Sequence, residues 1–174
     1  MIRPPLGSAV SWSADWGLFG GLLGPLFTVL PYRLGEVVLG IGWDGFAHRL
    51  FLWTAVAGAS LGLGGGAIGH RVASRLFAVH PALALLPGPV IGAIGGAALA
   101  GVVYAVEPAT FGARAVSYPE IARIAVPSSA LAVGAGFVVY VVMRAAHRSG
   151  WGALAVTVLV GLVAVPLAFA LSEM

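Results

Sequence analysis

The chain has 174 residues, of which 60% are hydrophobic and 9% are charged, whereas soluble domains have roughly 45–50% and about 25%. It contains neither Cys nor Lys, which excludes disulfides, thiolate nucleophiles and Schiff bases to retinal or pyridoxal phosphate. The formal net charge of +3 comes from nine scattered arginines, so we expect no nucleic-acid partner.

Long apolar stretches predict an all-α, polytopic membrane protein, with one transmembrane domain over residues 1–174. A run of about 20 apolar residues crosses a hydrocarbon core of about 30 Å. The predicted spans are 16–31, 46–69, 83–106, 124–143 and 151–171. The first span is short, contains Pro25 and stops at Pro31, so a re-entrant hairpin is the alternative to a crossing helix.

Residues 32–43 predict a short interfacial amphipathic helix after the first span. Their apolar side chains recur with the spacing i, i+3, i+4, i+7: Leu34, Val37, Val38 and Ile41. Tyr32 and Trp43 suit anchoring at the headgroups.

Two connections have recognisable signals. Residues 70–80 predict a polar turn between the second and third spans, with Arg71 and Arg75 in it. Ser117 and Glu120 have the spacing of a capping box, which predicts that a helix begins there.

Glycines dominate two of the spans. They are helix-packing candidates: Gly58, Gly62, Gly66 and Gly69 in the second span, and Gly88, Gly92 and Gly96 in the third. Glycines four residues apart let another helix approach closely in a bilayer. We predict that the tightest packing is between these two helices, and that the remaining glycine surfaces contact neighbouring subunits.

Two short patterns match catalytic signatures without their structural context. Residues 58–62 fit GxSxG around Ser60, and residues 64–69 fit GxGxxG. The first requires a strand-to-helix turn, and the second requires a preceding strand and an acid about 20 residues later. Within a membrane helix, Ser60 is instead expected to bond a carbonyl one turn earlier. We expect no catalytic residues and no enzyme.

Three histidines fall at the same side of the predicted bundle: His70, His80 and His147. Neighbouring arginines disfavour a cation there, so no metal site is expected. His70 is a candidate haem or chlorin ligand because Gly66, one turn earlier, leaves room for a flat ring. No second histidine at similar depth completes a pair, and we expect no cofactor.

Charged residues gather in the connections at the other side of the bundle. We call them the polar connections and treat them as a candidate docking surface: Arg33, Glu36, Asp44, Arg49, Glu107, Arg114, Glu120 and Arg123. Surface ion pairs add little stability, so contact with a partner is the more informative role.

These observations predict a non-catalytic integral membrane subunit that packs through glycine-rich helices into a larger membrane complex, with other membrane subunits and the lipid bilayer as partners. The alternatives are a small transport component that binds a solute between broken helices, and a pigment- or haem-associated subunit. We expect a prokaryotic inner (cytoplasmic) membrane protein, with its N-terminus inside and its C-terminus outside, from an excess of five arginines over four.

Overall fold

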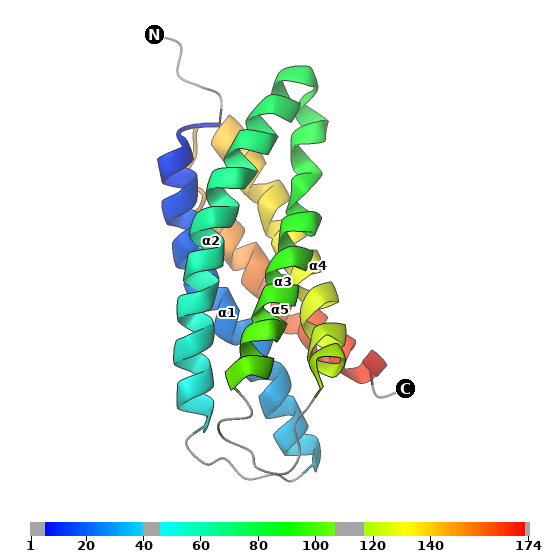
Figure 1. Ribbon diagram of the computed structural model, residues 1–174. Coiled ribbons are helices and arrows are strands. Elements are labelled where there is room, and N and C mark those ends of the chain that lie inside the picture. The colour runs from blue at the N-terminus through cyan, green and yellow to red at the C-terminus, as the bar shows by residue number, and fades with distance from the viewer. Residues whose placement is uncertain (1–5, 40–45, 107–116, 173–174) are drawn as a thin grey trace.

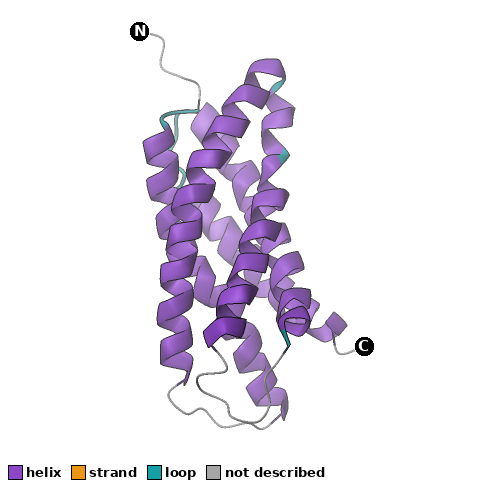
Figure 2. Cartoon of the chain, in the orientation of Figure 1, coloured by secondary structure: helices purple, strands orange, loops and turns teal. Residues whose placement is uncertain are grey.

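The structure is a computed structural model that describes residues 6–39, 46–106 and 117–172, with side chains over 6–30, 49–106 and 117–172. Within these ranges the chain forms helices and no strand. The helices are α1 (Ala9–Leu39), α2 (Phe46–Val79), the short 3₁₀ helix η1 (Pro81–Leu85), α3 (Pro87–Val106), α4 (Tyr118–Ala145) and α5 (Trp151–Ser172). The all-α prediction is confirmed, and Figure 2 shows helix along almost the whole described chain.

The helices have the length and composition of membrane spans. Among the described residues, four stretches are long and apolar enough to cross a bilayer: Arg49–Val79, Pro81–Val106, Tyr118–Ala145 and Trp151–Ser172. Helix α1 has 31 residues, which corresponds to about 46 Å. The chain is therefore a multi-pass membrane protein.

The helices run up and down the bundle (Figure 1). The start of α1, the α2–α3 connection and the α4–α5 connection lie together, and we call this the N-terminal end of the bundle. Helix α1 packs along α2, α3 packs along α4, and α5 packs mainly on α4 with a smaller contact to α1. The molecule thus consists of an α1–α2 hairpin and an α3–α4 hairpin, with α5 against both.

Two predicted boundaries are wrong. Helix α1 continues past Pro31 to Leu39, so residues 32–39 are not a separate interfacial helix, and residues 40–43 lie outside the described part. Helix α2 continues to Val79, so residues 70–79 are helical and the turn begins only at His80. Polar side chains at a helix end are solvated at the membrane surface, and they do not terminate the helix there.

Prolines do not interrupt the membrane helices. Helix α1 includes Pro25 and Pro31, α4 includes Pro127, and α5 includes Pro166. A proline removes one backbone donor, and membrane helices tolerate this where neighbouring groups compensate. Pro127 leaves the Arg123 carbonyl without its helical donor, and the Ser128 and Ser129 hydroxyls that follow it donate to the carbonyls of Ile124 and Ala125. The broken helices that motivated the transport alternative are therefore not seen in α1, α4 or α5.

Aromatic side chains fill the core near the N-terminal end of the bundle. Trp12, Phe19 and Tyr140 are fully buried. The Trp12 and Tyr140 rings lie 4.7 Å apart, edge to face, and the Trp16 and Tyr140 rings lie 5.6 Å apart. Edge-to-face pairs of this kind add stability beyond the burial of area, and this cluster joins α1 to α4.

Candidate functional site

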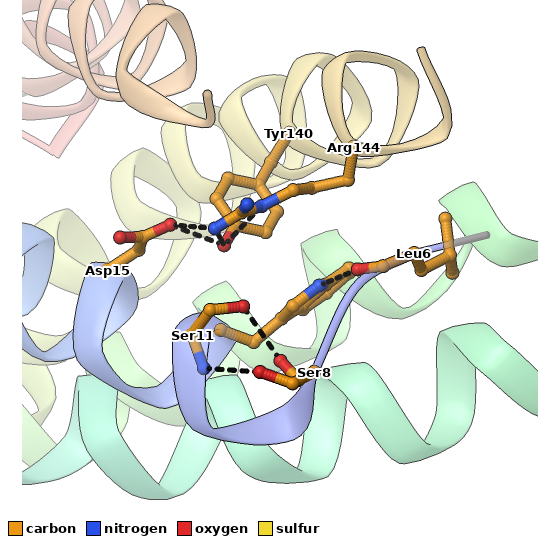
Figure 3. Close-up of polar contacts among 7 residues, drawn as sticks. Leu6, Ser8, Ser11, Asp15, Tyr140 and Arg144 are labelled. Atoms are coloured by element: carbon orange, nitrogen blue, oxygen red, sulfur yellow. Dashed lines mark hydrogen bonds and ion pairs between the residues drawn. The ribbon is translucent and has the colours of Figure 1, made fainter. Parts of the chain in front are cut away.

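A polar cluster of Asp15, Tyr140 and Arg144 joins α1 to α4 beside the aromatic core (Figure 3). The Tyr140 hydroxyl donates to Asp15 Oδ2 at 2.7 Å and accepts from Arg144 Nε at 3.1 Å and Nη2 at 3.0 Å. Arg144 Nη2 also forms an ion pair with Asp15 Oδ2. The Arg144 and Asp15 side chains are only 20% and 19% exposed. Each charge therefore has an opposite charge and a hydroxyl as partners, as required away from bulk water.

The chain preceding α1 is also fixed to this region. Trp12 donates from its indole nitrogen to the Leu6 carbonyl at 2.7 Å, and the His70 ring nitrogen Nε2 lies 3.1 Å from the Gly7 carbonyl. A carbonyl can only accept, so His70 carries its proton on Nε2. In this arrangement, His70 holds the N-terminal segment in place.

The other two histidines of this end do not join His70. His80 accepts from the Ala82 backbone at its Nδ1, at 3.2 Å, and so caps η1. His147 is exposed and has a positive φ of 55°. Among the residues the structure describes, no three His, Asp or Glu side chains gather in a way that could hold a metal ion.

The first glycine face, formed by Gly58, Gly62 and Gly66 of α2, contacts α1. A Cβ added at Gly58, Gly62 or Gly66 would overlap the α1 backbone, at Gly20, Trp16 and Trp12 respectively. The expected partner was the third span, so this part of the prediction is wrong. Only the adjacent face of α2 reaches α3, where a Cβ at Gly65 or Gly69 would lie 3.4 Å from Ile91.

The second glycine face contacts α4. A Cβ at Gly88 would lie 2.6 Å from the Phe137 Cβ, and one at Gly92 would lie 2.5 Å from the Ser129 carbonyl oxygen. A Cβ at Gly96 would overlap the Ser129 hydroxyl, which donates to the Gly92 carbonyl at 2.7 Å. Both glycine faces are thus used within the chain, one in each hairpin.

An apolar cavity of about 70 Å³ lies between the two hairpins. Its wall includes Trp16 and Phe27 of α1, Gly65 of α2, Gly95 of α3 and Phe137 of α4. No atom of the described residues lies within 4 Å of a Cβ built at Gly95. Most glycines of the wall are packed against a neighbouring helix, and among them only Gly95 has open space beside it.

Of the polar connections, the structure describes the side chains of three, and all three are exposed: Arg49, Glu120 and Arg123. Glu120 accepts from the Ser117 backbone and hydroxyl, each at 2.7 Å, which confirms the predicted capping box. The other members fall outside the side chains that the structure describes: Arg33, Glu36, Asp44, Glu107 and Arg114. Docking at this surface stays a prediction.

Ser60 behaves as a helix residue. Its hydroxyl donates to the Val56 carbonyl at 2.9 Å, one turn earlier, and it is exposed on α2. This confirms the expected back-bonding. The strand that each catalytic signature needs is absent from the part of the chain described here.

Sequence reasoning missed the polar cluster because Asp15 and Arg144 lie 129 residues apart. In the sequence, Asp15 directly precedes the first predicted span, and Arg144 directly follows the fourth, so neither residue stands out. The one available signal was an acid placed seven residues into α1, since an acid among apolar residues of a membrane helix requires a partner. No family model, curated protein or solved structure matches the chain.

Proposed function

We propose that the protein is a non-catalytic integral membrane subunit whose helix α2 packs against a helix of another subunit in a larger membrane assembly. The supporting observation is a pair of small residues, Ser60 and Gly64, that lie four apart and exposed on α2. No atom of the described residues lies within 4 Å of a Cβ built at Gly64. Such small residues let a second helix approach closely in a bilayer.

The glycines buried in the α1–α2 hairpin do not support this proposal, because Gly58, Gly62 and Gly66 already contact α1 of the same chain. Ser60 and Gly64 are on another side of the same helix, between the exposed side chains of Val56 and Ile68. A partner helix seated on Gly64 would find room between these two larger side chains, as a ridge finds a groove.

The experiment compares Gly64→Leu with Ala155→Leu after purification in a mild detergent. Ala155 is exposed on α5, so its replacement adds the same kind of side chain on a different face. We expect the wild-type protein and Ala155→Leu to co-purify with a partner in fixed stoichiometry. The amount of partner that co-purifies with Gly64→Leu should be lower by at least about tenfold. A wild-type protein that purifies alone, or a Gly64→Leu variant that retains its partner, contradicts the proposal.

A further inference from the structure

We propose that the partner of α2 is a membrane-spanning helix of a different protein that carries acidic residues at both of its ends. This inference rests on the proposed function, because it concerns the same surface of α2, and it adds the chemistry of the partner. Its basis is the set of residues that share one face of α2, and in particular the arginines at the two ends of that face.

One exposed face of α2 extends along the whole span. Each residue turns an α-helix by about 100°, so side chains three, four or seven residues apart lie on the same side. Six exposed residues of α2 follow this spacing, and we call them the arginine-bounded face: Arg49, Trp53, Val56, Ser60, Gly64 and Arg71. Arg75 is exposed one turn beyond Arg71.

The described part of the chain leaves this face uncovered. Gly58 and Gly62 pack on α1, and each is two residues from Ser60, or about 200° around the helix. The arginine-bounded face is therefore on the side of α2 opposite α1. Trp53 is 58% exposed, and no atom of the described residues lies within 4 Å of a Cβ built at Gly64.

The arginines of this face match the two surfaces of a membrane. Arg49 is in the first turn of α2, and Arg71 follows it by about 22 residues, or about 33 Å of helix. A hydrocarbon core is about 30 Å thick, so one arginine lies near each surface. Within the described ranges, the ion pair that forms joins Asp15 to Arg144, and no acid of these ranges pairs with Arg49, Arg71 or Arg75. Both ends of the face thus offer positive charge to a partner.

These charges argue against a second copy of the chain as the partner. Copies of a membrane protein insert with the same orientation, so α2 of one copy would pack on α2 of the other in parallel, with the same residues on both sides of the contact. Arg71 would then face Arg71, and Arg49 would face Arg49, which is unfavourable for like charges. A helix with Asp or Glu at each end instead supplies carboxylates, which form charge-assisted hydrogen bonds with arginine.

The test measures how two synthetic peptides bind to the chain in phosphatidylcholine vesicles. Each peptide is an apolar helix of about 20 residues with two glycines four apart at its centre. The aspartate peptide has two aspartates at each end, and the arginine peptide has two arginines. Because the chain has no Cys, a dye on Ser172→Cys reports binding of a labelled peptide by energy transfer. We expect this otherwise wild-type chain to bind the aspartate peptide at least about tenfold more tightly than the arginine peptide.

Charge reversal on the chain should reverse this preference. We expect Arg49→Glu/Arg71→Glu/Arg75→Glu to bind the arginine peptide more tightly than the aspartate peptide, a result that an unfolded chain would not give. Arg71→Glu alone should weaken binding of the aspartate peptide about three- to tenfold. Arg148→Glu is the matched control, because Arg148 is exposed after α4 at the same end of the bundle and outside the arginine-bounded face. It should leave binding unchanged.

A second comparison tests whether the peptide sits on this face. Gly64→Leu fills the centre of the face and should lower binding of the aspartate peptide at least about tenfold. Ala155→Leu adds the same side chain on α5 and should leave it unchanged. A preference for the aspartate peptide that Gly64→Leu does not affect would show that the arginines attract it elsewhere, which contradicts both the inference and the proposed function.

Three further results would overturn the inference alone. Equal affinities for the two peptides, both lost in Gly64→Leu, would show that α2 binds a helix whatever its charge. Energy transfer between labelled copies of the chain, lost in Gly64→Leu, would identify a second copy as the partner. Failure of the chain to bind the aspartate peptide would also contradict the inference, and the proposed function would then be decided by the co-purification experiment.

Discussion

Asp15, Tyr140 and Arg144 show how a few polar side chains can fix the packing of apolar helices. Lipid gives little hydrophobic drive for helix association, so van der Waals contact and polar bonds decide which helices pair. Here an ion pair and a shared hydroxyl connect the second turn of α1 to the last two turns of α4. The cluster therefore selects one register of α1 on α4 among many that apolar contact alone would permit.

A double-mutant cycle measures this selection. We expect Asp15→Ala and Arg144→Ala each to lower the free energy of unfolding by about 1–3 kcal/mol, because each leaves the other charge unpaired. The double variant should lose less than the sum, with a coupling of about 0.5–3 kcal/mol. Unfolding in sodium dodecyl sulfate, followed by circular dichroism, provides the free energies.

Tyr140→Phe is the matched control, since it removes the hydroxyl but keeps the ring and the direct Asp15–Arg144 contact. Its expected loss is about 1 kcal/mol. Strictly additive losses for Asp15→Ala and Arg144→Ala would mean that the ion pair does not contribute to the folded state.

The sequence predicted the helices better than it predicted their ends. Runs of apolar residues near 20 in length have few structures open to them in a membrane, because every backbone polar group must be satisfied internally. Helix ends are less constrained. Pro31 and the polar residues after Gly69 would stop many helices in water, yet α1 and α2 continue through them. Ser117 and Glu120 were a reliable signal because their hydrogen bonds are local.

At the scale of a helix pair, glycines of α2 set how closely α1 approaches. A Cβ at Gly62 would overlap the Trp16 carbonyl oxygen and lie 2.6 Å from its carbonyl carbon. Backbone cannot move aside as the end of a side chain can, so Gly62→Ala should force the two helices apart. We expect it to lower the free energy of unfolding by about 1–3 kcal/mol, measured by the same detergent titration.

Gly64→Ala is the control on the other side of the same helix, away from α1. It meets no atom of the described chain within 4 Å, and alanine favours a helix over glycine by about 1 kcal/mol. We expect it to be neutral or slightly stabilising. Similar free energies for Gly62→Ala and Gly64→Ala would show that α1 and α2 do not touch at Gly62.

For the whole molecule, the glycine pattern could not identify partners. A glycine at every fourth residue shows that one side of a helix has small residues. Any helix of complementary shape could pack on that side. Gly58, Gly62 and Gly66 accordingly pack on α1, not on α3. The pairing depends on which residues of α1 complement them, and Gly20 and Gly24 do so from a stretch that the sequence interpretation treated only as a short apolar run. The cavity could likewise not be predicted from the sequence, because its wall is formed by residues of four helices.

Orientation in the membrane is a property of the whole molecule that the chain makes easy to test, because it has no Cys. Ser149 precedes α5 and Ser172 ends it, so single cysteines at these two positions report on opposite ends of one span. Arg71, Arg75, Arg144 and Arg148 lie at the N-terminal end of the bundle, and arginine-rich connections tend to stay in the cytoplasm. We expect a membrane-impermeant maleimide to label Ser172→Cys in intact cells, and to label Ser149→Cys only after the membrane is opened. The reverse pattern would place the N-terminus outside, and labelling of both from one side would show that α5 does not cross.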